Sequence, residues 1–505
     1  MRGILLNWRI RMGLLASIVA GSAAAADLEL RTFWSPDLSI EERFELAKRT
    51  TPELIAFIRR MPKGGDLHNH VSGATFADFL LDSAQAAGQF YDISERRIVD
   101  AETDDTLTIA QLVASPEHLN DYRNRISVRG WRPASGSSGH HQFFSSFAYI
   151  GSVDRSADEM LAEVVLRNHY QNVHYLELML LPRNQAVLSR FFTRYRGVQM
   201  DDLAGSLEPL MTVVNDPELG SSIRESLDQF ERRVDDRIQA AGKNPTEMPV
   251  VRYVGSLNRV ADINQFFITA VIIMSVIAAD ERVVAINMVA PEDATLSRRQ
   301  FDDQMKILDF LWNELGRPAV TLHGGELVLR DSPVEPMRNR IRRTIDEGHA
   351  QRIGHGISVA WEEDVVGLLE QMRRDGVMVE INLTSNEVIL GIRNDDHPLQ
   401  LYRRAGVPVC FTTDDEGVNR SNLTMEYVKA VQRYDLSYGE LKDMTRNCLE
   451  YSFLPGQSLF IDHDYSRPRP IAGAKRGTKI ERQQSLESAF HRFEDSLNAG
   501  FREAF

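Results

Sequence analysis

The chain has 505 residues, of which 43% are hydrophobic, and it carries a formal net charge of −14. This composition excludes an intrinsically disordered chain and is sufficient for a large hydrophobic core. The acidic charge argues against a general nucleic-acid-binding protein, because such binding depends on neutralising phosphates with basic side chains, and we expect no nucleic-acid partner.

Residues 1–26 have the order of a secretory signal peptide. A basic stretch that ends at Arg11 precedes an apolar run at 12–20, and small residues follow at 21–26. The apolar run is short for a bilayer span, which favours cleavage over the alternative of a membrane anchor. We therefore expect cleavage near Ala26, a periplasmic or secreted location, and no stable membrane span in the mature chain.

Two short helices are predicted in residues 27–60. Ser39 and Glu42 have the spacing of a capping box. Thr51 followed by Pro52 has the pattern of an N-cap with proline at the first helical position. These helices lead into the predicted catalytic region.

A (β/α)8 barrel is predicted for residues 61–455. Short apolar runs that read as buried strands alternate with helical segments, and this alternation indicates a parallel sheet. The alternative is an open doubly wound sheet, but no GxGxxG motif follows the first run. The eight runs begin near Gly65, Val173, Val250, Val283, Ala319, Arg352, Val377 and Val407.

Two long insertions and a tail accompany the predicted TIM barrel. The insertions span about 84–139, after the first strand, and about 183–243, after the second. A helical C-terminal tail is expected at 456–505. The apolar segment 266–279 is too short to cross a membrane and is predicted to be a helix packed against the sheet.

The two cysteines of the chain are Cys410 and Cys448. A disulfide is permitted in an exported protein, but two buried thiols are an equally open alternative, because sequence does not give the distance between them.

Metal-ligating side chains follow several of the predicted strands. His68 and His70 lie two residues apart, so they point to the same side of a strand, while His323 and Asp414 end two other strands. The carboxyl ends of barrel strands meet at one mouth. Each residue alone has an ordinary alternative, such as a surface pair, a core histidine or a helix N-cap. Together they predict a site for one Zn²⁺ per chain.

Further candidate catalytic residues also stand at the ends of predicted strands. Glu326 stands three residues after His323 and is placed to transfer a proton, while His355 could orient or activate water and Asp415 could contact the substrate. His140 and His141 are interpreted as an ordinary loop pair. The following histidines are interpreted as structural or surface residues: His118, His169, His174, His349, His463 and His491.

The motifs around these residues resemble the adenosine deaminase family of metal-dependent hydrolases. The resemblance covers about residues 61–453 and is closest to the secreted, growth-factor-like branch and to bacterial exported relatives. It is carried by MPKGGDLHNH, HGGE, RIGHG, HPLQLYRRAGVPVCFTTDDEG and SNLTMEYVKA.

The resemblance implies roles for these residues. Zinc held by the four ligands would make hydroxide available, Glu326 would protonate the purine nitrogen next to the attacked carbon, and His355 would position and activate the hydroxide. Asp415 would contact the N7 side of the purine. Two-metal relatives need a lysine on a middle strand, where this chain has Asn287, so one metal is expected.

Three positions bear on the purine and sugar. Phe144, in the run 141–147, matches the family's aromatic gate helix, with an ordinary amphipathic helix as the alternative. Ser72 stands where the family often has an aspartate that touches the ribose. Ala290 stands where it often has a glycine whose N–H meets the purine.

The predicted function is zinc-dependent hydrolytic deamination of adenosine, or a close adenine nucleoside, to inosine and ammonia. The alternative is an aminohydrolase of another purine, modified nucleoside or nucleotide, and a third hypothesis is an inactive nucleoside-binding protein. A small-molecule purine nucleoside is the expected partner, and the sequence does not give the oligomeric state.

Overall fold

The computed structural model describes most of the chain beyond its first residues. The predicted signal peptide at 1–26 lies outside the described residues and stays a prediction. The described residues are 32–35, 37–133, 136, 138–182, 184–470 and 473–498.

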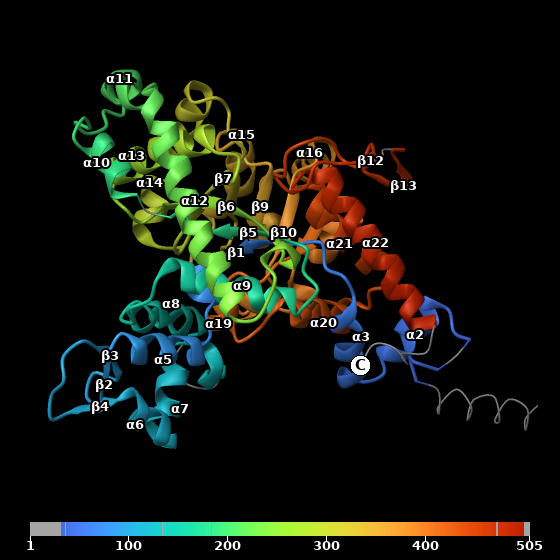
Figure 1. Ribbon diagram of the computed structural model, residues 1–505. Coiled ribbons are helices and arrows are strands. Elements are labelled where there is room, and N and C mark those ends of the chain that lie inside the picture. The colour runs from blue at the N-terminus through green and yellow to red at the C-terminus, as the bar shows by residue number, and fades with distance from the viewer. Residues whose placement is uncertain are drawn as a thin grey trace, which may run out of the picture.

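Eight parallel strands form the centre of the molecule (Figure 1). They make two four-stranded sheets, in the orders β1-β5-β6-β7 and β11-β10-β9-β8. Parallel bridges from Asn69 to Asp414 and from Ile286 to Val320 join these sheets at both edges, which closes the barrel and confirms the predicted (β/α)8 fold. The strands are β1 (Asp66–Asn69), β5 (Tyr175–Met179), β6 (Val250–Asn258), β7 (Val283–Val289), β8 (Thr321–Gly324), β9 (Arg352–His355), β10 (Met378–Ile381) and β11 (Val409–Phe411).

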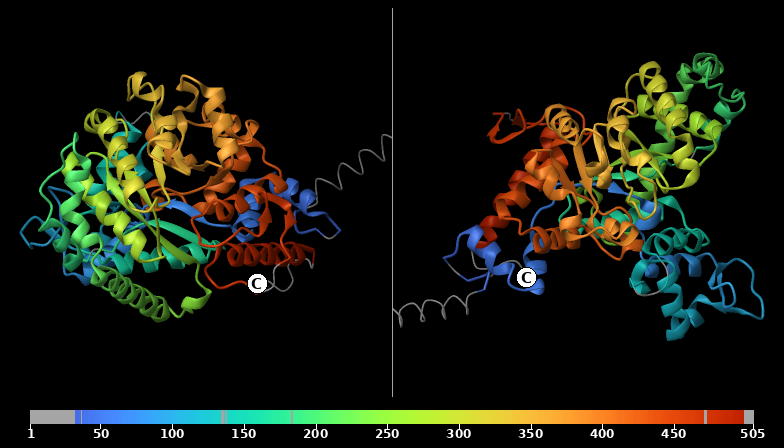
Figure 2. Two further views of the ribbon diagram at one scale, coloured as in Figure 1. Left: turned by 90° about the horizontal axis from the view of Figure 1, so that it is seen from above. Right: turned by 180° about the vertical axis from the view of Figure 1, so that it is seen from behind.

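Helices surround the strands, as the view from above shows (Figure 2). Most barrel strands are buried along their whole length, because helices cover the outer side and side chains fill the inner side. The flanking helices are α9 (Ala157–His169), α13 (Ile263–Ala279), α14 (Thr295–Glu314), α15 (Arg340–Asp346), α16 (Val365–Asp375), α17 (Leu383–Leu390), α18 (Leu399–Arg404), α19 (Glu416–Asn419), α20 (Leu423–Tyr434) and α21 (Tyr438–Glu450). Short 3-10 turns are η2 (Pro245–Glu247), η3 (Glu335–Met337), η4 (Ile357–Trp361) and η5 (Asn394–Asp396).

The first insertion is a small α+β unit beside the carboxyl end of β1 (Figure 1). Its antiparallel sheet has the order β3-β2-β4, and Tyr91 and Tyr122 are fully buried in an apolar cluster that continues to Val388 and Val418 of the barrel. The chain then returns to the barrel through α8. The elements are α4 (Val71–Ala74), α5 (Ala77–Ala86), β2 (Phe90–Asp92), β3 (Arg97–Val99), β4 (Thr106–Thr108), α6 (Ile109–Ala114), α7 (Pro116–Arg125), η1 (Val128–Gly130) and α8 (Gly139–Ile150).

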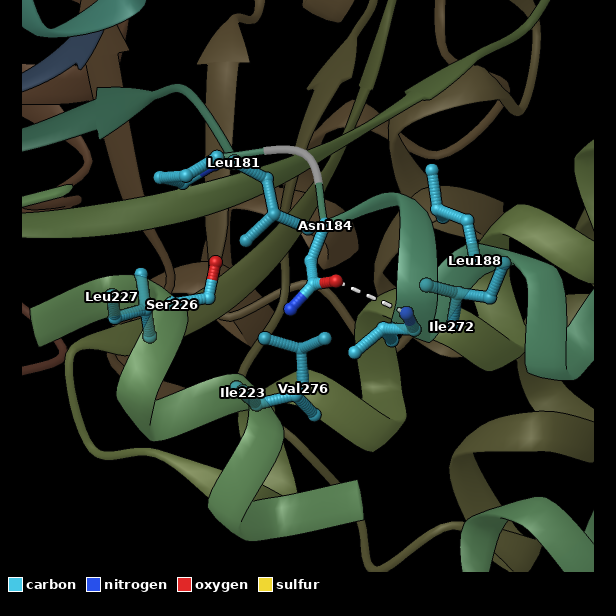
Figure 3. Close-up of a pocket in the computed structure, with 10 residues that line it drawn as sticks. Leu181, Asn184, Leu188, Ile223, Ser226, Leu227, Ile272 and Val276 are labelled. Atoms are coloured by element: carbon cyan, nitrogen blue, oxygen red, sulfur yellow. Dashed lines mark hydrogen bonds between the residues drawn. The ribbon is translucent and has the colours of Figure 1, made fainter. Parts of the chain in front are cut away.

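The second insertion is entirely helical among its described residues. It consists of α10 (Gln185–Phe192), α11 (Leu203–Val214) and α12 (Pro217–Ala240). An apolar cavity of about 70 Å³ lies between α10, α12 and α13, where Leu188, Ile223 and Ile272 line it (Figure 3). The insertion therefore extends the helical layer outside β6.

The N-terminal helices pack against the C-terminal tail. These elements are α2 (Ile40–Ala47), α3 (Thr51–Arg60), β12 (Phe460–Ile461), β13 (Asp464–Pro468) and α22 (Lys479–Asn498). Ser39 forms the predicted capping box with Glu42. The N-cap of α3 is Thr50, not Thr51 as predicted, because the Thr50 hydroxyl accepts the hydrogen bond from the backbone N–H of Glu53.

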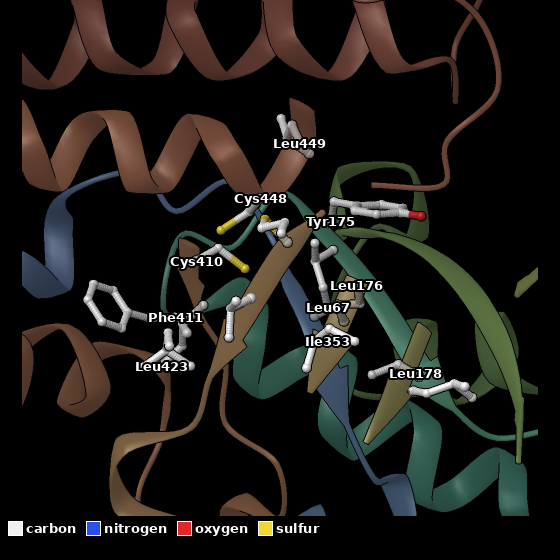
Figure 4. Packing of buried hydrophobic residues seen from close by; sticks show 14 of the residues in the cluster. Leu67, Tyr175, Leu176, Leu178, Ile353, Cys410, Phe411, Leu423, Cys448 and Leu449 are labelled. Carbon is white, nitrogen blue, oxygen red and sulfur yellow. The ribbon is translucent and has the colours of Figure 1, made fainter. Parts of the chain in front are cut away.

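Cys410 and Cys448 are both free and buried in the barrel core. Figure 4 shows them among the apolar side chains between β11 and α21. The sequence left a disulfide and two thiols as alternatives, and the structure has two thiols.

No helix among the described residues is long and apolar enough to cross a membrane. This includes α13, whose apolar residues are buried against the barrel strands and neighbouring helices.

Phe57 provides a test of the packing between α3 and the tail. Its ring is fully buried and lies 5.3 Å from that of Phe493 and 5.3 Å from that of Phe44. We expect Phe57→Ala to lower the free energy of unfolding by about 3–5 kcal/mol, because it leaves a cavity in an aromatic cluster. Phe192→Ala is the control, since that side chain is 53% exposed. Equal thermal denaturation midpoints for the two variants would contradict the described packing.

Candidate active site

Three histidines and one aspartate converge at the mouth of the barrel. One ligand atom from each of His68, His70, His323 and Asp414 lies within 4.8 Å of the others. The Nε2 atom of His323 is 3.1 Å from that of His68 and 3.3 Å from that of His70, and Asp414 Oδ1 is 3.3 Å from His70 Nε2. Ligand atoms about 2.1 Å from a tetrahedral ion lie about 3.4 Å apart, so these separations fit a metal ion.

The Nδ1 atoms of two of these histidines make hydrogen bonds on the side of the ring away from the other ligands. His68 Nδ1 is 2.7 Å from Glu380 Oε2, and His323 Nδ1 is 3.0 Å from Asn287 Oδ1. Both oxygens are acceptors, so each ring carries its proton on Nδ1 and presents a lone pair on Nε2. Lone pairs 3.1 Å apart repel one another unless a cation lies between them. The donor set therefore fits a metal that prefers nitrogen and oxygen ligands.

A buried ionic network supports the first of these histidines. Arg352 Nη2 lies 2.5 Å from Glu177 Oε2, and Arg352 Nε lies 2.7 Å from Glu380 Oε1. Burial alone would raise the pKa of Glu380, but Arg352 and the hydrogen bond with His68 lower it to about 2. Glu380 is therefore an ionised acceptor that fixes the ring of His68.

The segment that carries Glu326 is held by buried charges. The backbone N–H of Glu326 donates to Glu292 Oε2 at 2.7 Å, and Arg259 donates to the carbonyl of His323 at 2.7 Å. Burial raises the pKa of the Glu326 carboxyl well above its ordinary value, and the charges of Asp414 and Glu292 raise it further. A raised pKa favours the protonated carboxyl, which is the form that can act as an acid.

Three residues that line one cavity each carry a buried polar atom without a partner. Glu326 Oε1, His355 Nε2 and Asp415 Oδ1 are buried and make no hydrogen bond among the described residues. Burial and the neighbouring Asp414 raise the pKa of Asp415 well above its ordinary value. A Cβ on Gly73 would lie 1.8 Å from Asp415 Oδ1, so only glycine leaves room for this carboxyl. Buried polar atoms of this kind mark the contacts of a ligand.

Backbone strain is concentrated around this space. Ala290, His355 and Asp414 have φ values of 81°, 70° and 61°, in the left-handed region that favours glycine. Such conformations cost of order 1 kcal/mol each and persist where the surrounding structure imposes them, commonly at functional sites. The glycine that the resemblance places at position 290 is explained by this conformation.

These residues enclose a cavity of about 290 Å³, near the lower end of the about 300–1,000 Å³ that small-molecule sites occupy. Phe143, Phe144 and Phe147 of α8 form its apolar wall. The predicted substrate-binding residues Ser72, Phe144, Ala290 and Asp415 all line it, together with His70, His323, Glu326, His355 and Asp414.

The interpretation of His140 and His141 as a loop pair is wrong. Both lie in the first turn of α8, which begins at Gly139. His140 Nε2 is 3.0 Å from Asp293 Oδ1, and its ring packs 4.7 Å from that of Phe144. The serine and glycine residues before them suggested a loop, but Ser138 is the N-cap of the helix.

The sequence interpretation missed the residues that support the ligands. Glu380 and Glu177 are single carboxylates inside apolar strand runs, and such charges are rarely buried without a partner. That rule could have identified them. Asn386 contacts His355, and His397 contacts Asn386. No sequence spacing connects either residue to the other residues of the site.

Comparison with known proteins is consistent with this geometry. The family model described as adenosine deaminase matches residues 131–459. An adenosine deaminase of Enterococcus faecalis is 33% identical over 28% of this chain and 39% of its own length. An aminodeoxyfutalosine deaminase of Streptomyces coelicolor is 35% identical over 22% of this chain and 29% of its own length. The chain thus matches less than half of these curated relatives.

The fold is also found in solved structures. The crystal structure of the arabidopsis N6-mAMP deaminase superposes on 86% of this chain and 99% of its own, with a TM-score of 0.52 and 20% identity. At this identity the similarity establishes the fold alone.

Removing a ligand tests the metal centre. We expect Asp414→Ala to lower bound metal at least about tenfold from about one ion per chain, because it removes the carboxylate of the group. Inductively coupled plasma mass spectrometry on the gel-filtered protein measures this. His349→Ala is the control, since His349 pairs with Asp309 away from the ligand group. Equal metal contents in the two variants would exclude the proposed ligand set.

Position 290 tests the strained backbone. We expect Ala290→Gly to raise the free energy of unfolding by about 0.5–1 kcal/mol, because glycine adopts a φ of 81° without strain. Ala110→Gly, on the exposed surface of α6, should instead lower it by about 0.5–1 kcal/mol. Chemical denaturation of both variants measures the difference, and a loss of stability at position 290 would contradict the strained conformation.

Proposed function

The chain belongs to the adenosine deaminase family, and from that premise we propose that it hydrolyses adenosine, or a close adenine nucleoside, to inosine and ammonia. One zinc ion, held by the four clustered ligands, is part of the proposal. The observation that carries the proposal is the buried carboxyl group of Glu326. Its pKa is raised, and it lines the same cavity as His70, His323 and Asp414. It supports the proposal because hydrolysis of an aromatic amine needs a proton donor beside the group that supplies the attacking oxygen.

Bound zinc would act as a Lewis acid that makes hydroxide available near neutral pH. The side chains of the cavity are proposed to transfer the proton and to bind the substrate. Glu326 gives its proton to the ring nitrogen beside the attacked carbon, which neutralises the charge that attack places on the ring. At the attacked carbon, a bond to the water oxygen forms and the bond to the amino nitrogen breaks. One proton of the water leaves with the amino group as ammonia, and the other replaces the proton that Glu326 gave to the ring. The overall reaction therefore consumes one water per substrate.

Asp415 and the aromatic wall are proposed to hold the base. A protonated Asp415 donates from its unpartnered Oδ1 to a ring nitrogen, and the phenylalanines of α8 pack against the ring face. Ser72 lies on the same cavity and offers a hydroxyl where a sugar would extend. This arrangement orients the amino group toward the metal ligands.

The composition of the cavity favours a neutral substrate. The described residues that line it include no lysine or arginine. A phosphate group would therefore enter without a basic side chain to neutralise it. We therefore propose a nucleoside in preference to a nucleotide, with another purine or a modified nucleoside as the second candidate.

An exported location is proposed as well. It rests on the order of basic, apolar and small residues in 1–26 alone. Detection of the mature protein outside the cytoplasm would support it.

A substrate panel with one variant tests the function. Ammonia release is measured for adenosine, 2′-deoxyadenosine, adenine and AMP, with zinc counted in the same samples. We expect turnover of the nucleosides and little turnover of AMP. Glu326→Gln should lower kcat on adenosine by about 10²–10⁴-fold while zinc stays bound, because the amide cannot donate the proton in the same way.

Glu314→Gln is the control, since Glu314 lies on the exposed side of α14. Unchanged turnover in Glu326→Gln would exclude the proposed acid. Nucleoside binding without ammonia release by the zinc-loaded wild type would favour a binding protein instead.

A further inference from the structure

A chain of hydrogen bonds runs from the backbone of α18 to the ring of His355. It passes through His397 and Asn386, whose side chains are both buried. In each hydrogen bond, one group is the donor, and identifying it determines which group donates in the next hydrogen bond. The protonation of the last ring can therefore be worked out from the first.

The first link fixes the ring of His397. The backbone N–H of Leu399 donates to His397 Nδ1 at 3.1 Å, so this nitrogen is an acceptor without a proton. Burial lowers the pKa of His397 to about 3, so the ring is neutral and must carry its one proton on Nε2.

The second link fixes the amide of Asn386. His397 Nε2 lies 3.2 Å from Asn386 Oδ1, and since the nitrogen carries the proton, it donates to the oxygen. The amide cannot be rotated by half a turn, because its NH₂ group would then face the N–H of His397. Asn386 Nδ2 must therefore point to the other side.

The third link fixes His355. Asn386 Nδ2 lies 2.9 Å from His355 Nδ1 and donates to it, so this nitrogen is an acceptor too. Asn382 Nδ2 approaches the same atom at 3.5 Å, while its own Oδ1 accepts from the Thr412 hydroxyl. Glu326 Oε1 is 3.6 Å from His355 Nδ1, beyond hydrogen-bond distance. The neutral ring is left with its proton on Nε2.

We propose that Asn386 and His397 are positioning residues that hold the proton of His355 on Nε2, so that the ring presents an N–H donor to the reacting oxygen. His355 lines the cavity, and Nε2 is its ring nitrogen without a hydrogen-bond partner among the described residues. His355 then orients the attacking oxygen and does not remove its proton, because its only lone pair accepts from Asn386. The catalytic consequence rests on the proposed function, whereas the position of the proton does not.

The direct test is nuclear magnetic resonance of the zinc-loaded protein with ¹⁵N-labelled histidine. The His355 signals are identified by their loss in His355→Asn. We expect the wild type to carry the ring proton on Nε2, with Nδ1 unprotonated. A proton on Nδ1 of His355 in the wild type would overturn the proposal, whatever the substrate proves to be.

Variants of the relay separate positioning from simple loss of structure. At pH 8, Asn386→Asp places a carboxylate, which can only accept hydrogen bonds, next to Nδ1 of His355. We expect the ring proton of His355 to move to Nδ1. The kcat should fall about 100-fold or more with little change in KM. Asn386→Leu removes the donor, and the proton should no longer be confined to Nε2. Asn313→Asp, on the exposed side of α14, is the control.

His397 is tested through its conservative replacement. His397→Gln keeps an N–H group near the position of Nε2, and His397→Leu removes it. We expect the glutamine variant to keep the His355 proton on Nε2 and to lose less activity than the leucine variant. Equal kcat in Asn386→Asp and the wild type, or a His355 proton on Nε2 in both Asn386 variants, would exclude the relay.

Discussion

The mutual repulsion of lone pairs at the barrel mouth is the constraint on which the rest of the site depends. The Nε2 atoms of His68 and His323 lie 3.1 Å apart, and between two neutral rings no hydrogen bond relieves that contact, because both Nδ1 atoms donate to acceptors. A cation between the two atoms makes the arrangement favourable. The strands, the acceptors behind the rings and the strained backbone together hold these groups in the arrangement that a cation requires.

The barrel interior is arranged to maintain this geometry. Glu177 on β5, Arg352 on β9 and Glu380 on β10 form one buried ionic network that crosses the barrel beneath His68. A buried ion pair contributes little net stability after desolvation, but removing one partner leaves an unpaired charge. The network therefore makes the orientation of His68 depend on several strands at once, and its value lies in fixing the ligand rather than in stabilising the fold.

The sequence predicted the parts of the molecule that follow from periodicity and strand order. Buried parallel strands are continuous apolar runs, and their carboxyl ends must meet, so His68, His323 and Asp414 could be placed together from their positions alone. Sequence order does not say which side chains stand behind a ligand, because those contacts depend on side-chain direction across the barrel. Glu380 and Asn386 were missed for this reason, and the start of α8 was misread from the composition of the residues before it.

The first insertion supports the aromatic wall of the cavity, although it lies outside the barrel. One side of α8 provides the phenylalanines that wall the cavity, and Gln142 of the same helix donates to the backbone carbonyls of Asn124 and Ser127 in the insertion. The barrel holds the same helix from another side, because α8 also packs against α17 and His140 Nε2 lies 3.0 Å from Asp293 Oδ1. The insertion and the barrel therefore fix the position of the wall together. Since the clustered ligands, Glu326 and Asp415 all belong to the barrel, a change within the insertion would shift the aromatic wall and leave those polar groups in place.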